Sequence, residues 1–286
     1  MIVAIGASAG GLEAIEQFLE HMPADRRITF LIVVHRSTDQ PTLLSQVLRS
    51  HTPMPVVDAV NGMPIKPSHV YVGPPGHYLV IRKNKLYLLT LKKQAGSTLP
   101  IDYCFRSVAE DRKRHAVGIL LSGMGSDGTI GLRRIKDQGG LTLVQEPRSA
   151  LHVGMPESAI GSDVADYVLP PNRMPDQLLR HVANPHLMVR VSPLGPAAPP
   201  SREAWDKIMV LIRDQAGHDF SCYKPSAILR RIERRMNVHH IKDLALYGRY
   251  LEETPNELTT LANELLIGVT SFFRDAEAWK AFAKAL

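Results

Sequence analysis

Three polar side chains of this 286-residue chain are of the types that covalent acyl-transfer chemistry requires. Ser8 lies in GASAG (residues 6–10), which fits the G-x-S-x-G pattern that displays a nucleophilic serine at a strand-to-helix turn. His35 ends the apolar run ITFLIVVH, and Asp127 lies in the loop GMGSDG (residues 123–128). A serine, a histidine and an aspartate permit a nucleophile, a general base and an acid that orients the base.

The glycines around Ser8 could instead cradle a phosphate. A dinucleotide fingerprint, however, has glycine where Ser8 stands, and its second strand usually ends with Asp or Glu rather than with His35. The Gly-Lys-Ser/Thr signature of a P-loop does not occur in the sequence. The serine-nucleophile interpretation is therefore favoured, with helix capping by Ser8 and by Asp127 as the structural alternative.

Strand-like and helical runs alternate over the first 183 residues. The strand-like runs are MIVAIG, ITFLIVVH, HVYVGPP, AVGILLSG, LTLVQE and DYVLP, and YLVIRKNKLYLL indicates a hairpin that turns at Lys83-Asn84. Helices are predicted behind the first strand and at about 40–50, 103–114, 129–138 and 174–182. This alternation predicts an α/β fold: a doubly wound, mainly parallel sheet with an antiparallel insertion.

The predicted sheet explains how the three polar residues could meet. Each follows a strand, and in doubly wound sheets ligands gather at the carboxyl ends of the parallel strands. The N–H groups of Ala9 and of the loop around Met124 could then bind an oxyanion, each worth roughly 3 kcal/mol in comparable sites. The chain order Ser, His, Asp differs from the Ser, Asp, His order of α/β-hydrolases, which disfavours that superfamily.

A proline-rich segment divides the chain. Residues 184–202 hold five prolines and are predicted to be a linker of polyproline character between domains at 1–183 and 203–286. After the linker, apolar residues recur only with helical spacing, so a small all-α domain is expected. The residues that recur include Trp205, Ile208 and Ile212, then Ile228, Ile232 and Met236, then Leu244, Tyr247 and Leu251, and finally Leu258, Leu261 and Leu265.

Composition and charge restrict the class of protein. No apolar run approaches the roughly 20 residues that a membrane span needs, and no signal peptide is recognisable. Cys104 and Cys222 are far apart in sequence, so a cytoplasmic location is expected. A basic cluster predicts contact with an acidic partner, with a solvated helix face as the alternative, and no aromatic pattern indicates nucleic acid. The arginines of that cluster are Arg230, Arg231, Arg234 and Arg235.

Five segments resemble the catalytic domain of the chemotaxis receptor methylesterase (CheB) family. They are IVAIGASAGGLEAI, VVHRS, VYVGPPGHYL, GILLSGMGSDGTIGL and HVGMPESAI. Members of that family hydrolyse glutamate methyl esters on receptor cytoplasmic helices, and many also deamidate glutamines there. The resemblance implies that Ser8 is the nucleophile, His35 the base, Asp127 the orienting acid, and Met124 a backbone donor to the oxyanion. It implies no metal or cofactor for this reaction.

The second domain resembles the N-terminal domain of the chemotaxis receptor methyltransferase (CheR) family. In NELLIGVTSFFRDAEAW (residues 263–279), Thr270 and Arg274 align with residues that contact S-adenosylmethionine, and helix 226–236 aligns with a segment that faces the receptor. The sequence ends before any glycine-rich strand-turn-helix, so it is expected to be the front part of a methylesterase–methyltransferase fusion. Esterase activity is expected, and methyl transfer or cofactor binding only with the missing domain.

Three functions remain open at the level of sequence. The favoured one is a serine esterase acting on methyl-accepting receptors, without nucleic acid binding or membrane insertion. The second is a non-catalytic receptor-binding or regulatory module with a vestigial triad. The third is a general hydrolase of small esters or amides. The presence of Ser8, His35 and Asp127 together favours an enzyme.

Overall fold

A computed structural model describes residues 1–25, 27–35, 43–90, 99–183, 202–217, 220, 223 and 225–266. The chain divides into two compact units, Met1–Val191 and Ser192–Leu286. The linker predicted at 184–202 lies outside the described residues except for Arg202, with which the first helix of the second unit begins.

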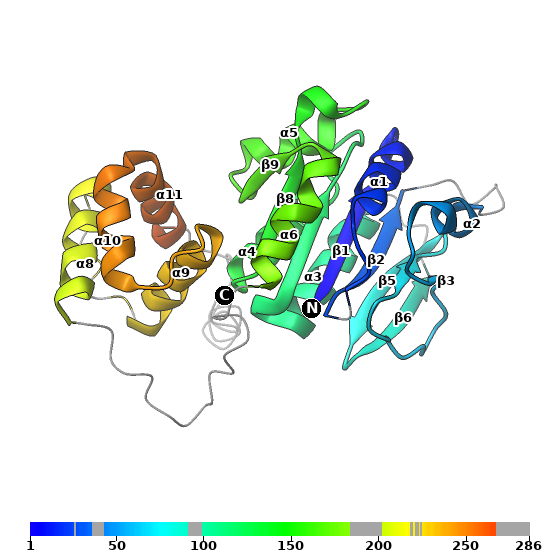
Figure 1. The fold of residues 1–286 in the computed structure, drawn as a ribbon, viewed down its shortest axis with the longest axis horizontal. Helices are drawn as coiled ribbons and strands as arrows, with labels where there is room; N and C mark the ends of the chain where they lie inside the picture. Colours follow the sequence, from blue (N-terminus) through cyan, green and yellow to red (C-terminus); the bar gives the residue numbers. More distant parts are fainter. Residues whose placement is uncertain are drawn as a thin grey trace, which may run out of the picture. The chain divides into compact units, whose positions relative to one another are not determined.

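Seven strands in the described part of the first unit form one parallel sheet, in the order β3-β4-β2-β1-β7-β8-β9 (Figure 1). They are β1 (Ile2–Ala7), β2 (Thr29–Val34), β3 (Val56–Asp58), β4 (Val70–Val72), β7 (Ala116–Leu120), β8 (Leu141–Gln145) and β9 (Tyr167–Leu169). The chain leaves β1 toward β2 on one side and returns at β7 on the other, so the strand order reverses at β1. The predicted doubly wound, mainly parallel sheet is confirmed.

Helices cover both faces of this sheet. The bounds are α1 (Gly11–Glu20), α3 (Pro100–Arg112), α4 (Thr129–Asp137), α5 (Gly154–Gly161) and α6 (Met174–Val182), with the short α2 (Leu44–Leu48) after β2. Helix α3 packs on α4, and α4 on α5, while α1 and α6 both contact the turn at Pro171–Arg173. Right-handed crossovers require two faces, because strands are added in opposite directions from β1.

The core between the sheet and α3 fixes how closely that helix approaches β1. Its buried residues include Ile2, Ala4, Leu31, Val33 and Phe105. A Cβ at Gly6 would collide with the side chain of Ile101, so glycine at this position allows α3 to lie directly on β1. The helix therefore begins close to the carboxyl end of β1.

A separate antiparallel hairpin, β5 (His77–Arg82) and β6 (Lys85–Thr90), packs beside α3. Lys83 and Asn84 have φ angles of 46° and 63°, the left-handed conformation that a type I′ turn requires at both central residues. The hairpin predicted to turn at Lys83-Asn84 is confirmed, and it forms a sheet of its own. Leu79 and Ile81 face the core, which leaves the alternate residues on an outer face.

Several element predictions differ from the structure. The helix predicted at about 40–50 is represented by α2 (Leu44–Leu48) and a following 3-10 turn, and residues 36–42 lie outside the described residues. Helix α3 begins three residues before its predicted start, because Pro100 suits a first helical turn. Strand β3 and helix α5 were not predicted. Strand β3 has only three residues, and α5 has eight with a glycine at each end, so neither shows a clear periodicity of apolar residues.

The second unit is all-α in its described residues, as predicted. Its helices are α8 (Arg202–Ala216), α9 (Pro225–Val238), α10 (Leu244–Glu253) and α11 (Pro255–Leu266). The residues that recur with helical spacing form one buried cluster, which includes Ile208, Ile212, Ile228, Ile232, Tyr247, Leu251, Leu261 and Leu265. Asp243 caps α10 by accepting a hydrogen bond from the N–H of Leu246 at 2.9 Å.

A buried ionic cluster corrects the prediction of a basic partner surface on α9. Arg234 pairs with Glu264 at 2.9 Å, and Arg235 pairs with Glu257, with all four side chains buried. These arginines hold α9 against α11, because a buried charge requires a paired and hydrogen-bonded partner. Arg234 and Arg235 therefore do not belong to an exposed basic surface. Glu257 also accepts hydrogen bonds from the Tyr247 hydroxyl and the His239 ring.

Replacing Glu257 with glutamine should destabilise the second unit by about 2–3 kcal/mol at neutral pH, because Arg235 would lose the closer of its two buried counter-charges and keep only Glu264, at 3.4 Å. Burial alone would raise the pKa of Glu257, but hydrogen bonds from Arg235 and His239 lower it to about 2. A lowered pKa means that this stabilisation is present above pH 4.5 and is lost as the pH falls to about 2.

Urea unfolding of the full chain, followed by tryptophan fluorescence, measures this effect, because both tryptophans (Trp205 and Trp279) belong to the second unit. The control is Glu253→Gln, at an exposed position of α10. Equal stability of Glu257→Gln and Glu253→Gln at pH 7 would show that the ionic cluster does not support the unit.

Candidate active site

Ser8 follows β1 at the carboxyl edge of the sheet. Its N–H donates to the carbonyl of Ser122, and its own carbonyl accepts from the N–H of Gly11, both at 2.9 Å. These bonds shape a tight turn into α1, where Gly10 is the N-cap with a left-handed φ of 69°. No side chain caps α1 at this position, so the structure does not support a capping role for Ser8.

His35 follows β2, the strand beside β1. The register pairs Ala7 with Val34, and the N–H of His35 continues the ladder by donating to the Ala7 carbonyl at 2.9 Å. Ser8 and His35 are therefore neighbours across one parallel strand pair. The side chain of His35 is exposed, so it can exchange protons with solvent or with a bound molecule.

Asp127 lies in the loop after β7, on the other side of β1, and is only 6% exposed. Its Oδ2 accepts from the N–H of Ile101 at 3.1 Å, and its Oδ1 from the N–H of Asp102 at 2.9 Å. It thus caps the first turn of α3 rather than α4, whose N-cap is Gly128.

The electrostatics of Asp127 reflect its burial. Desolvation raises the pKa of this carboxyl to about 6, although the N–H groups of Asp102 and Ile101 favour its charged form. The carboxyl of Asp102 raises the pKa further, and His35 lowers it. His35 is therefore close enough to Asp127 for its charge to act on the carboxylate.

The three candidate residues thus follow three adjacent strands, β2, β1 and β7. Among these described residues, no hydrogen bond joins the Ser8 hydroxyl, the His35 ring and the Asp127 carboxylate. Even-numbered residues of β1 and odd-numbered residues of β2 face α3. Ser8 and His35 come directly after these two strands, at the edge of the sheet where α3 begins. Catalytic hydrogen bonds are often long without substrate and tighten when it binds.

Two backbone donors lie in or next to the turn that carries Ser8. The N–H groups of Ala9 and Met124 donate to no other residue in the described part of the chain. The Met124 loop lies against Ser8, because a Cβ at Gly123 would collide with the Ser8 Cβ and with the Met155 thioether. Free N–H groups beside a hydroxyl are the elements of an oxyanion hole.

A buried polar network beneath these loops was missed from the sequence. The Oγ of Ser122 donates to the Ala9 carbonyl and accepts from the N–H of His152, both at 2.9 Å. The N–H of Ser122 donates to Oε1 of Gln145 at 2.8 Å. The network joins the loops after β1, β7 and β8. The only sequence signal for this network is that Ser122 (in LLSG) and Gln145 (in LVQE) stand at the ends of predicted strands. Serine and glutamine are not residue types that by themselves indicate burial.

The remaining predicted site residues belong to the second unit. Thr270 and Arg274 lie outside the described residues. On α9, Arg230 is exposed and Arg231 is half-buried, so a basic surface on this helix is reduced to these two. No helix in the described part of the chain combines the length and the hydrophobicity that crossing a bilayer demands.

An Asp127→Asn variant tests the raised pKa of this carboxyl. Because the folded protein holds the proton more tightly than the unfolded chain does, the unfolding free energy should fall as the pH rises from 3.8 to about 6. The loss should be on the order of 2–3 kcal/mol and absent in the variant. Carbon NMR of labelled aspartates identifies Asp127 as the signal that the variant lacks; titration of that signal near pH 4 would contradict the prediction.

A Ser122→Ala variant tests the buried network. The change leaves the Ala9 carbonyl and the His152 N–H without their partner, at a cost of about 1–3 kcal/mol. Amide hydrogen exchange in residues 121–125 and 150–155 should accelerate by about 10- to 100-fold if these loops open locally. Ser50→Ala, at an exposed position, is the control. Unchanged exchange in both loops would exclude the network as their support.

Comparisons with known proteins agree with this architecture. Residues 3–178 match the family model described as CheB methylesterase, and residues 203–266 match the all-alpha domain of the CheR methyltransferase. The crystal structure of the Thermotoga maritima CheB methylesterase catalytic domain is similar at a TM-score of 0.58 and 28% identity. That similarity covers 62% of this chain and 96% of the Thermotoga chain.

Curated relatives match either most of the chain or about two thirds of it. An uncharacterized 104.1 kDa protein of Rhodobacter capsulatus is 34% identical over 84% of this chain and 27% of its own length. A protein-glutamate methylesterase/protein-glutamine glutaminase of Syntrophus aciditrophicus is 37% identical over 63% of this chain and 51% of its own. The chain thus spans about half the length of these relatives or less. With the family model matching more than half of its residues, the chain belongs to the CheB methylesterase family, and a CheR-type all-alpha domain follows its CheB-type domain.

Proposed function

We propose that the first unit hydrolyses methyl esters of glutamate side chains in proteins, with Ser8 as the nucleophile. The observation that carries the proposal is the position of Ser8 at the reversal of strand order, beside His35 and the unpaired N–H groups of Ala9 and Met124. Membership of the CheB family supports the same chemistry.

The reaction assigns one role to each group. His35 takes the proton of the Ser8 hydroxyl while the oxygen attacks the ester carbonyl, and the tetrahedral oxyanion accepts hydrogen bonds from the N–H groups of Ala9 and Met124. The protonated His35 then gives its proton to the departing methoxide, which leaves as methanol. A water molecule, activated by His35 in the same way, hydrolyses the glutamyl-serine ester and releases the glutamate carboxylate.

Asp127 would orient His35 and stabilise its protonated form. A carboxylate has about four acceptor positions, and the N–H groups of Ile101 and Asp102 use two of them, so acceptor capacity remains for the imidazole. With its pKa raised to about 6, Asp127 is mostly charged at neutral pH, as this role requires.

The same steps apply to a glutamine side chain, with ammonia in place of methanol as the leaving group. We propose that neither reaction uses a cofactor. Ala9 retains the backbone donor but offers no side-chain hydroxyl to the site.

The proposed substrates are methyl-accepting chemotaxis receptors, whose cytoplasmic helices would be reached from the cytoplasm without membrane insertion or nucleic acid. The relatives' names, which specify protein-glutamate methylesterase/protein-glutamine glutaminase, support a protein glutamate as the target. The CheR-type helices would contribute receptor contact, for which Arg230 and Arg231 are candidates. Binding of S-adenosylmethionine through Thr270 and Arg274 is proposed only when a cofactor-binding domain follows.

A Ser8→Ala variant of the full chain should abolish methanol release from methylated receptor, a loss on the order of 10⁴-fold or more. The control is Ser126→Ala, an exposed serine at the same edge of the sheet. Mass spectrometry after treatment with a serine-directed phosphonate should show the adduct on Ser8 alone.

The outcomes separate the three functions that the sequence leaves open. Turnover of small esters but not of methylated receptor would identify a general hydrolase. Receptor binding without turnover of any ester would identify a non-catalytic module. Full activity of Ser8→Ala would remove Ser8 from the mechanism.

A further inference from the structure

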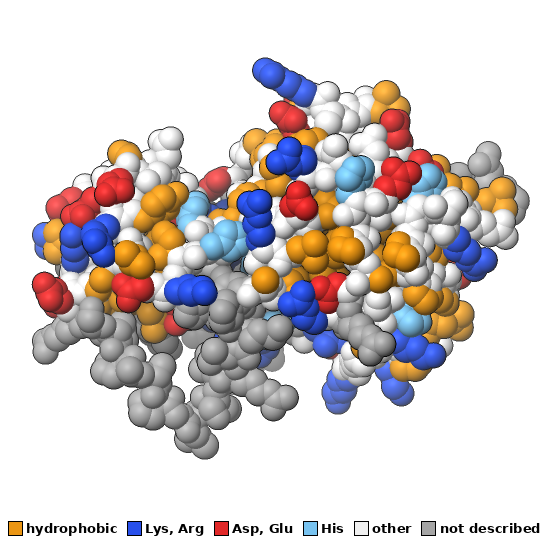
Figure 2. All heavy atoms as spheres, in the orientation of Figure 1, with side chains coloured by type: hydrophobic (Ala, Val, Ile, Leu, Met, Phe, Trp, Pro, Cys, Tyr) orange, Lys and Arg blue, Asp and Glu red, His pale blue; other side chains and the backbone are white. Residues whose placement is uncertain are grey.

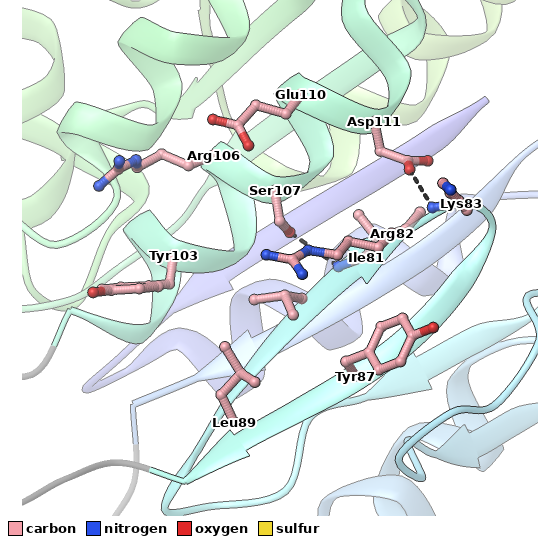
Figure 3. Close-up of a pocket in the computed structure, with 11 residues that line it drawn as sticks. Ile81, Arg82, Lys83, Tyr87, Leu89, Tyr103, Arg106, Ser107, Glu110 and Asp111 are labelled. Carbon is pink, nitrogen blue, oxygen red and sulfur yellow. Dashed lines mark hydrogen bonds between the residues drawn. The ribbon is translucent and has the colours of Figure 1, made fainter.

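A groove of about 660 Å³ lies between the β5–β6 hairpin and α3 (Figure 3). One side is a stripe of α3 at helical spacing, formed by Tyr103, Arg106, Ser107 and Glu110. The other is the outer face of the hairpin, where Val80 pairs with Tyr87, and Arg82 with Lys85. None of these residues belongs to the candidate active site.

Beside the groove, both edges of the hairpin already donate hydrogen bonds within the fold, which disfavours an added strand. Two outward N–H groups of β5 beside the groove are used within the fold: Ile81 donates to the Ser107 Oγ at 3.1 Å and Lys83 to the Asp111 Oδ1 at 2.6 Å (Figure 3). On β6, the N–H of Leu86 donates to Met63 and that of Leu88 to Asn61. A molecule that binds in the groove is therefore expected to be recognised through its side chains. A helix binds in this way, whereas an added strand binds mainly through backbone hydrogen bonds.

The charges of the groove favour an acidic occupant. Its two acids already have partners: Asp111 lies 3.1 Å from Arg112, and Glu110 lies 3.8 Å from Arg134. The cations Arg82, Lys83 and Arg106, in contrast, form no ion pair with a described residue and are exposed. Figure 2 shows Lys and Arg side chains gathered around the turn end of the hairpin, beside hydrophobic ones.

Apolar surface accompanies these cations. Leu89 is 47% exposed and Tyr103 is 44% exposed, and the Tyr103 ring stacks on Tyr78 with 4.1 Å between centroids. Exposed aromatic and aliphatic side chains rimmed by one sign of charge are typical of protein interaction sites. The surface fits an apolar helix stripe flanked by carboxylates.

The groove also begins next to the candidate active site. Asp127 caps Ile101 and Asp102, and Tyr103 is the next residue of α3. From Tyr103 to Asp111 the groove follows α3 for about 12 Å, or two helical turns. A helix seated in it would extend away from the edge where Ser8 and His35 lie.

We propose that this groove is an exosite, a binding site outside the reacting centre, for an acidic amphipathic helix of the protein that carries the ester. The inference rests on the proposed function, because hydrolysis of glutamate esters requires a glutamate-bearing segment to be held beside Ser8. The cations of the groove select the acidic flanks of that helix, and Tyr103 and Leu89 contact its apolar stripe.

The test uses the full chain with Ser8→Ala, so that binding is measured without turnover. The probe is a fluorescein-labelled amphipathic peptide of about 20 residues with a leucine stripe flanked by glutamates, and its matched control has glutamine at those positions. Fluorescence anisotropy should show that the glutamate peptide binds more tightly and that added salt weakens its binding.

Adding Arg82→Glu should weaken binding of the glutamate peptide on the order of tenfold and leave the glutamine peptide unaffected. The change should not unfold the hairpin, because it places a negative charge opposite Lys85. Arg180→Glu, the same charge reversal at an exposed position of α6 on the other face of the sheet, should have no effect. An equal loss with Arg180→Glu, or equal binding of both peptides, would overturn the exosite.

Two further measurements separate this inference from the proposed function. With Ser8 intact, Arg82→Glu should release methanol from a small glutamate methyl ester at the original rate, because the small ester does not reach the groove. A chain that binds the glutamate peptide but hydrolyses no ester would refute the proposed function alone. Displacement of the peptide by a single-stranded oligonucleotide would instead identify a nucleic-acid groove and overturn the exosite.

Discussion

The candidate site depends on one interaction, the capping of α3 by the buried carboxylate of Asp127. The bond pair from Ile101 and Asp102 ties the start of α3 to the loop after β7. Asp102 in turn caps α4: its Oδ1 accepts a hydrogen bond from the N–H of Gly131, in the first turn of that helix, at 2.6 Å. Two helices and the loop that carries Met124 are thus fixed to one another by reciprocal caps.

Burying two carboxyl groups this close together costs free energy, so the use of aspartate at residue 127 needs a physical reason. Asp102 and Asp127 are both buried, and burial raises the pKa of each. Helix capping alone does not require a charge, since asparagine or serine caps as well and avoids the repulsion between two carboxylates. A carboxylate at residue 127 is consistent with the proposed function, in which Asp127 orients His35 and stabilises its charged form during the reaction.

Much of this site follows from the sequence because strand ends are easy to recognise. Apolar runs such as ITFLIVV define strands buried on both faces, and the topology of a doubly wound sheet then brings Ser8 and His35 to one edge. The cap of α3 could not be derived, because Ile101 and Asp127 are far apart in sequence and no local pattern links them. Ser122 and Gln145 were missed for the same reason: their partners are backbone groups of distant loops.

The distribution of charged residues along the sequence likewise does not predict which charges are exposed on the folded protein. Arg234 and Arg235 belong to the densest basic cluster of the sequence, yet they are buried against Glu264 and Glu257 as part of the helical core. Arg82 and Arg106 are 24 positions apart and belong to no basic cluster that the sequence analysis identified. Both nevertheless line one groove. A partner responds to charge that is exposed and close in space, and only the pairing of hairpin and helix α3 determines which cations meet that condition.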